Sequence, residues 1–221
     1  MSLSIQKYAS KFSDYFRGIF NKQDKFEMVC QLVGLSVIGY FSLKTIFGLY
    51  KKLRRLLPLD LSRYGKGSWA VVTGASDGIG RALCEELALQ GFNIVLIARN
   101  KEKLEKVAQE LNVLNKDILT KIVIADFENS TKEGFFDEIY SQIESLDISI
   151  LINNAAVGSG MSLFHQLEDS FLSTLLTVNV HPVIMLTKKL IEKLRARQGH
   201  KAIINVSSAS GIEPMAYVAT Y

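Results

Sequence analysis

Apolar residues follow two different patterns, one before and one after about residue 68. Between Met28 and Tyr50 the chain runs for 23 residues with a single charge, Lys44. A helix of about 20 such residues crosses the hydrocarbon core of a bilayer. A lysine near its end can extend its charged head to the interface, where aromatic residues also concentrate. We therefore expect a transmembrane helix over 28–50, with a buried helix of a soluble domain as the alternative.

Basic segments flank this apolar stretch on both sides. In residues 1–27, the apolar positions from Ser4 to Phe20 have helical spacing, which is typical of an amphipathic helix at a membrane surface; a loosely ordered tail is the alternative. Residues 51–67 form a basic juxtamembrane linker that starts with a cluster of Lys51, Lys52, Arg54 and Arg55. Such a cluster favours the cytoplasmic side, although the lysines of residues 1–27 weaken that signal.

From residue 68 onward, short apolar runs alternate with helical patterns. Continuous apolar runs are typical of parallel strands that are buried on both faces. Strands are expected at 69–74, 93–99, 121–127, 148–154 and 202–208, and helices at 79–90, 101–111, about 131–143 and about 168–197. Because crossovers between parallel strands are right-handed, residues 68–221 are predicted to form an α/β, Rossmann-like doubly wound sheet.

Charge and composition limit the classes of partner that this chain can bind. Residues 1–67 carry a net charge of +8 and residues 68–221 carry −4. A basic arm suits nucleic acid or a membrane, and the long apolar stretch inside this arm favours a membrane over nucleic acid. The two cysteines cannot make a disulfide framework, and the three histidines lack the spacing of metal ligands, so we expect no metal.

A glycine-rich turn ends the first expected strand of the sheet and opens the helix that follows. Glycines permit a tight turn and a close approach of the backbone to a pyrophosphate, while the helix N-terminus offers free N–H groups. The strand, turn and helix context separates this turn from an ordinary glycine-rich loop. The residues expected to bind a dinucleotide here are Thr73, Gly74, Ser76, Asp77, Gly78, Ile79 and Gly80.

The glycine spacing Gly-x-x-x-Gly-x-Gly resembles that of the short-chain dehydrogenase/reductase family, and further motifs follow in the family's order. Asn153-Asn154-Ala155 resembles its N-N-A-G motif, with Ala156 in place of the glycine. The resemblance implies that Asn153 and Ala155 contact the cofactor. An alanine adds only a methyl group, so we expect it to be tolerated unless the backbone has a positive φ there.

The resemblance also implies a catalytic set. Asn179 resembles the family's catalytic asparagine, and Ser208 and Tyr221 stand 13 positions apart like its serine and tyrosine. Tyr221 would donate a proton, Ser208 would hold the carbonyl oxygen, and Asn179 would join a proton relay through water. Pro182 has no N–H, so the carbonyl of Val178 loses its helical partner, which is a local reason for a water site.

Two residues at the ends of strands bear on the cofactor. The second strand ends in Arg99, where an NAD enzyme usually carries a carboxylate for the ribose 2′-hydroxyl. An arginine can bind a 2′-phosphate, which favours NADP(H) over NAD, although a merely solvated arginine is the alternative. Asp126 resembles the family's aspartate that contacts adenine, and a simple turn or helix cap explains it equally well.

The stretch from Gly67 to Gly80 and the preceding apolar segment resemble the membrane-anchored very-long-chain 3-oxoacyl-CoA reductases and the related 17β-hydroxysteroid dehydrogenases. This implies reduction of 3-oxoacyl-CoA in fatty acid elongation, with a steroid substrate as the alternative. It also implies the endoplasmic reticulum membrane, a cytosolic catalytic domain, a lipid substrate, and an elongation complex or a homodimer.

The family's motif continues beyond the printed sequence. Its lysine, four residues after the tyrosine, would be at position 225, and the family's final strands and substrate loop would follow. We therefore expect the sheet of residues 68–221 to be incomplete at its C-terminal end and the chain of 221 residues to be inactive by itself. A non-catalytic, membrane-tethered dinucleotide-binding or scaffold protein is the alternative from a different class of function.

Overall fold

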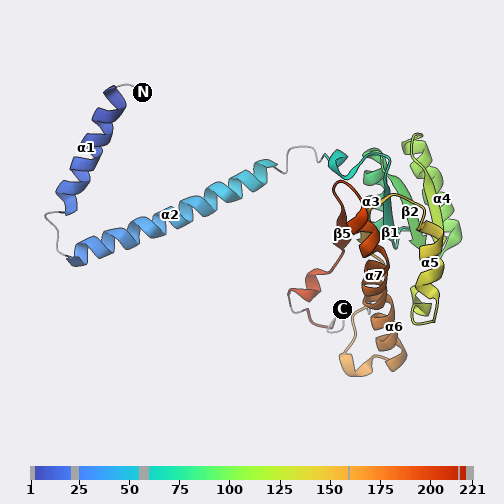
Figure 1. Cartoon of the computed structure of the whole chain (residues 1–221). Coiled ribbons are helices and arrows are strands. Elements are labelled where there is room, and N and C mark those ends of the chain that lie inside the picture. Colours follow the sequence, from blue (N-terminus) through green and yellow to red (C-terminus); the bar gives the residue numbers. More distant parts are fainter. Residues whose placement is uncertain (1–2, 21–24, 55–59, 159, 214, 218–221) are drawn as a thin grey trace. The chain divides into compact units, whose positions relative to one another are not determined.

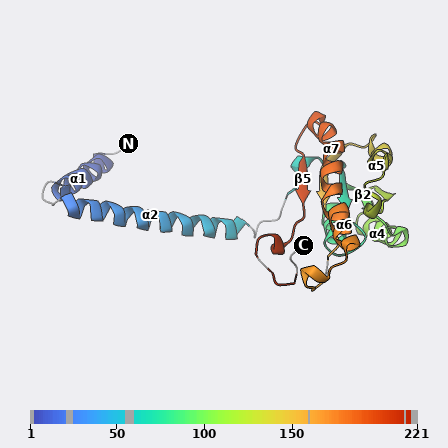
Figure 2. The same cartoon turned by 90° about the horizontal axis from the view of Figure 1, so that it is seen from below.

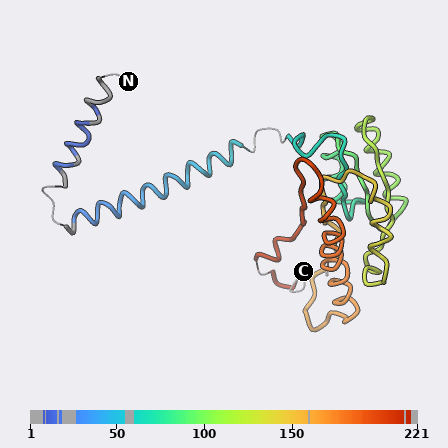
Figure 3. Tube along the Cα trace, in the orientation of Figure 1, coloured from blue at the N-terminus to red at the C-terminus, as the bar shows by residue number. Residues whose placement is uncertain are grey.

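The computed structural model describes residues 3–20, 25–54, 60–158, 160–213 and 215–217. The chain divides into two compact units, Met1–Leu59 and Asp60–Tyr221. Each unit is described by itself, and Figure 3 follows the Cα trace through both.

The first unit consists of two helices, α1 (Leu3–Phe20) and α2 (Lys25–Arg54) (Figure 1). The helix α2 extends beyond the expected 28–50 because charged residues at both ends continue it. From Glu27 to Arg54 it is long and apolar enough to cross a membrane, and none of its most apolar part is buried. Large apolar side chains are exposed on all of its sides, and they include Leu32, Val33, Leu35, Ile38, Phe41, Leu43, Ile46 and Phe47.

The second unit is built on a parallel sheet of five strands in the order β3-β2-β1-β4-β5. The strands are β1 (Trp69–Thr73), β2 (Asn93–Ala98), β3 (Thr120–Ile124), β4 (Ile148–Asn153) and β5 (Ala202–Asn205). Both β2 and β4 are buried along their whole length, as their continuous apolar runs predict. The Rossmann-like parallel sheet is therefore confirmed.

Helices cover both faces of this sheet (Figure 2). One face packs against α3 (Gly78–Leu89) and α4 (Lys101–Leu114), and the other against α5 (Phe135–Ile143), α6 (Asp169–Asn179) and α7 (His181–Ala196). The segment from Asp169 to Ala196 is also apolar enough to pass as a membrane span. Its leucines Leu186, Leu190 and Leu194 belong to the core of this unit, and 22% of its most apolar part is buried.

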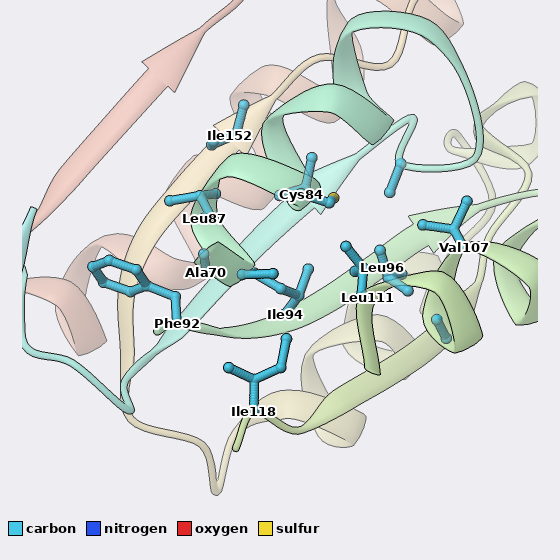
Figure 4. Packing of buried hydrophobic residues seen from close by; sticks show 14 of the residues in the cluster. Ala70, Cys84, Leu87, Phe92, Ile94, Leu96, Val107, Leu111, Ile118 and Ile152 are labelled. Carbon is cyan, nitrogen blue, oxygen red and sulfur yellow. The ribbon is translucent and has the colours of Figure 1, made fainter. Parts of the chain in front are cut away.

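The core on the face of α3 and α4 is a layer of mostly aliphatic side chains, with Phe92 at one edge of it (Figure 4). Cys84 of α3 lies in this layer with no exposed surface. Burial raises the pKa of its thiol to about 12, because the thiolate would lose its hydration. Cys84 therefore acts as a small apolar core residue and not as a nucleophile.

Two of the expected helices differ from the observed ones. The helix expected from about residue 131 begins at Phe135, because Gly134 just before it has φ of +78° and cannot continue a helix backwards. The helix expected over 168–197 is broken at Val180 into α6 and α7, and Pro182 stands in the first turn of α7.

Candidate functional site

A cavity of about 460 Å³ opens at the carboxyl ends of β1, β2 and β4. This is the edge of a doubly wound sheet at which ligands bind, next to the point where the strand order reverses. Among its lining residues are eight of the predicted site residues, namely Gly74, Ser76, Asp77, Gly78, Ile79, Arg99, Asp126 and Ala155. The fold thus brings together most of the predicted dinucleotide-binding set.

The glycine turn is compact because two of its glycines leave no room for a side chain. Gly74 has φ of +65°, and a Cβ on it would lie 2.9 Å from the Cα of Ala155. A Cβ on Gly80 would lie 2.3 Å from the carbonyl oxygen of Gly74 and 2.5 Å from Nδ2 of Asn154. The first turn of α3 therefore packs directly against the end of β1 and the loop after β4.

The N-terminus of α3 presents hydrogen-bond donors at this cavity. The carboxylate of Asp77 accepts from the N–H of Gly78 at 2.8 Å, and the N–H of Arg81 reaches the carbonyl of Asp77 at 3.3 Å. Within the described chain the N–H groups of Ile79 and Gly80 have no acceptor. Because a helix N-terminus also carries partial positive charge, this arrangement fits the pyrophosphate of a dinucleotide.

Thr73 lies beneath the cavity and holds the loop that follows β4. Its hydroxyl oxygen accepts from the N–H of Asn154 at 2.9 Å and from the N–H of Ala155 at 3.0 Å. The side chain of Asn154 donates to the carbonyl of Thr73 at 3.0 Å. The two strand ends are therefore joined by reciprocal bonds, and Thr73 acts by positioning rather than by lining the cavity.

The side chains of the neighbouring residues Asn153 and Asn154 lie in different surroundings. Asn154, which the sequence did not single out, lines the cavity. The predicted Asn153 is buried and donates to Thr187 at 3.2 Å and to Asn205 at 2.8 Å, on the side of α7 and β5. Successive residues of a strand point to opposite faces, so only one of the pair can face the cavity.

Asn179 ends α6 and fastens the same loop from the opposite side. Its side-chain oxygen accepts from the N–H of Val157 at 2.8 Å, and its side-chain nitrogen donates to the carbonyl of Val157 at 2.9 Å. The side chain is thus engaged with backbone, and the carbonyl of Val178 has no hydrogen-bond donor within the described chain. Because Pro182 has no N–H, this carbonyl lacks its usual helical donor.

The remaining predicted catalytic residues are only partly described. Ser208 is half-buried at the start of a short 3₁₀ turn, η4 (Ala209–Gly211), and its hydroxyl oxygen accepts from the hydroxyl of Ser210 at 2.8 Å. Tyr221 lies outside the described residues. Ala156, which replaces the family's glycine, is not at a positive φ, since Tyr217 is the non-glycine residue with positive φ among those described. The alanine is therefore compatible with the backbone.

Two ion pairs lie beside the cavity, near the carboxyl end of β2. Arg99 donates to Glu128 at 2.9 Å, and Lys103 donates to Asp77 at 3.0 Å. The ammonium group of Lys103 and the N–H of Gly78 hold the pKa of the Asp77 carboxyl below its usual value. Asp126 accepts from the backbone N–H of Glu128 at 3.1 Å and so caps the 3₁₀ turn η2 (Phe127–Asn129).

Comparison with known proteins gives a consistent result. The family model described as short chain dehydrogenase matches residues 68–221. The chain is 35% identical over 196 residues to a very-long-chain 3-oxoacyl-CoA reductase of Pyricularia oryzae, covering 86% of this chain and 58% of that protein. It is 36% identical over 193 residues to very-long-chain 3-oxoacyl-CoA reductase-A of Danio rerio, with coverages of 86% and 58%.

Solved structures share the fold of the second unit. L-sorbose reductase from Gluconobacter frateurii, solved with NADPH and L-sorbose, matches with a TM-score of 0.64 and 28% identity over 72% of this chain and 59% of that chain. A metagenomic short-chain oxidoreductase in complex with NADP matches with a TM-score of 0.64 and 29% identity over 72% and 70%. The chain spans somewhat more than half the length of the two curated relatives described above.

Proposed function

Because the chain belongs to the short-chain dehydrogenase family, we propose that it is a membrane-anchored, NADP-dependent ketoreductase that acts on 3-oxoacyl-CoA in very-long-chain fatty acid elongation. The observation that carries the proposal is the cavity that the glycine turn and Arg99 line at the carboxyl ends of the strands. The names of the curated relatives support the acyl-CoA substrate.

In the proposed reduction, the cofactor and the protein chain have different roles. A nicotinamide cofactor, when bound, supplies the hydride that reduces the carbonyl carbon. The N-terminus of α3 holds the pyrophosphate, and the loop fastened by Asn179 shapes the floor of the cavity. Ser208 binds the carbonyl oxygen and Tyr221 gives it a proton, so that a ketone becomes an alcohol.

Proton transfer from Tyr221 is proposed to require a phenol pKa that its surroundings have lowered. The phenol of a tyrosine has a pKa of about 10, too high for efficient proton transfer near neutral pH. The family motif places a lysine one helical turn after this tyrosine, at position 225, where its ammonium would lower that pKa.

Cofactor selectivity tests the proposal at Arg99. We expect NADPH to bind more tightly than NADH, because the guanidinium pairs with the 2′-phosphate. Arg99→Asp should narrow or reverse this preference, since a carboxylate accepts from the ribose 2′-hydroxyl and repels the phosphate. Dissociation constants from the quenching or enhancement of nicotinamide fluorescence give both affinities. Equal affinities in the wild type that the substitution leaves unchanged would contradict the assignment.

Anchoring is proposed to occur through α2 in the endoplasmic reticulum membrane, with residues 68–221 in the cytosol. The exposed apolar surface of α2 supports insertion, and the basic cluster after it supports a cytosolic domain. Alkaline carbonate should leave the protein in the membrane pellet, and protease added to sealed microsomes should digest the domain. Release by carbonate would argue against a membrane helix, and protection from protease would reverse the orientation.

Two alternative functions are a hydroxysteroid dehydrogenase and a non-catalytic dinucleotide-binding protein. A hydroxysteroid substrate would use the same reductase chemistry, and the structural likeness to a 7β-hydroxysteroid dehydrogenase, at a TM-score of 0.61 and 29% identity, keeps it a candidate. A non-catalytic dinucleotide-binding protein would keep the cofactor site and lack turnover in its complete form. A homodimer and an elongation complex are further predictions about partners.

A further inference from the structure

Glu128 forms an ion pair with the guanidinium group of Arg99, on which the proposed cofactor selectivity depends. Arg99 follows β2, Glu128 lies in η2 after β3, and both line the cavity. Nη1 of Arg99 donates to Oε1 of Glu128 at 2.9 Å, across 29 positions of sequence. The side chains of Arg99 and Glu128 are 63% and 48% exposed, so solvent and a ligand can reach both.

The surroundings of this pair do not favour an extra negative charge. Five charged side chains gather at this end of the site, and together they carry a net charge of −1: the cations Arg99 and Lys103 against the carboxylates Asp77, Asp126 and Glu128. Lys103 is already paired with Asp77 and Arg99 with Glu128. A phosphate arriving here therefore meets a guanidinium whose charge a carboxylate has already neutralised.

The backbone around η2 keeps Glu128 in this position. Its N–H donates to the carboxylate of Asp126 at 3.1 Å, and the N–H groups of Asn129 and Ser130 donate to the carbonyls of Asp126 and Phe127 at 2.9 and 3.0 Å. One of these bonds uses the backbone N–H of Glu128, and none of them uses its carboxylate. Replacing the side chain by its amide would therefore remove the charge and leave the turn intact.

From this arrangement we infer that Glu128 is a specificity-determining residue that limits the preference for a 2′-phosphorylated cofactor. The inference rests on the proposed use of NADP(H). A 2′-phosphate carries a charge between −1 and −2 near neutral pH and must share Arg99 with Glu128 or displace it. A ribose 2′-hydroxyl carries no charge and can donate to a carboxylate. Glu128 thus lowers the affinity for NADP⁺ and leaves the affinity for NAD⁺ unchanged or slightly higher.

The experiment measures the dissociation constants of NADP⁺ and NAD⁺, which differ only in the 2′-phosphate, by calorimetry on the 221-residue chain in detergent. Glu128→Gln should tighten NADP⁺ binding about three- to tenfold, as expected for removing one unit of charge beside the phosphate, and change NAD⁺ binding by less than about twofold. Raising the salt concentration to about 0.5 M should shrink the gain, because this exposed charge is screened.

Glu105→Gln is the matched control. Glu105 pairs with Lys101 on α4 at 3.6 Å, and its side chain is also 48% exposed, but it does not line the cavity. It should leave both constants unchanged. A gain of the same size in Glu105→Gln would overturn the inference, because the effect would then follow net charge alone.

Arg99→Gln separates this inference from the proposed function. If it lowers the preference for NADP⁺ and Glu128→Gln has no effect, the cofactor assignment stands and the role of Glu128 is overturned. In the double variant, Glu128→Gln should no longer improve NADP⁺ binding as much as it does alone, because the two residues act on each other. If the wild type binds neither dinucleotide, the proposed function fails, and the inference fails with it.

Discussion

Gly80→Ala is expected to destabilise the second unit by about 1–3 kcal/mol and to weaken dinucleotide binding strongly, since a methyl group overfills a closely packed contact. Its Cβ would lie 2.3 Å from the carbonyl oxygen of Gly74 and 2.5 Å from Nδ2 of Asn154. The first atom is backbone, so relief requires the first turn of α3 to move away from β1. That movement displaces the N–H groups of Ile79 and Gly80 from the phosphate position.

Urea unfolding and NADPH titration of the variant measure the two effects separately. Gly211→Ala is a suitable control, because a Cβ there would lie at an ordinary distance of 4.0 Å from Oγ of Ser207. Gly80→Ala with wild-type stability and wild-type affinity would show that close packing of this turn is not needed for binding.

The second large effect is expected at Thr73. Thr73→Val keeps the shape of the side chain but leaves the N–H groups of Asn154 and Ala155 without their acceptor. Each backbone donor left unpaired away from water costs about 1–3 kcal/mol, so the loss of two partners should lower the unfolding free energy of the variant by about 2–6 kcal/mol. NADPH affinity should fall as well, because the loop after β4 lines the cavity.

Thr73→Ser tests whether the hydroxyl carries this effect. Serine keeps the acceptor and loses only a methyl group, so most of the stability and affinity should return. A valine variant as stable as the wild type, or a serine variant as damaged as the valine variant, would contradict the role assigned to the hydroxyl.

The sheet could be predicted from sequence because its central strands, β1, β2 and β4, are buried on both faces. The run from Ile94 to Ala98 is apolar throughout, and continuous runs separated by helical patterns have few other solutions. The glycine turn could be predicted for a related reason, since its backbone requirements are local. The break at Val180 was harder to predict, because a proline in the first turn of a helix and one inside a helix look alike in sequence.

The details of the site depend on contacts between distant positions. The choice between Asn153 and Asn154 depends on which face each side chain takes, and a shift of one residue reverses it. Because β4 is buried along its whole length, its sequence shows no alternation that could have decided it. The pairing of Glu128 with Arg99 joins the ends of two strands, and no local pattern around Glu128 indicates it. The bonds between Asn179 and Val157 likewise appear only in the folded chain.

Hydrogen exchange with and without NADPH tests the central claim, that the cavity at the ends of β1, β2 and β4 holds this cofactor. A second cavity of about 460 Å³, between α7 and the loop before α5, serves as an internal comparison. The account predicts saturable protection of the amides of residues 78–80 and 154–157, with no change in residues 130–137. Protection confined to residues 130–137, or no protection at saturating NADPH, would contradict it.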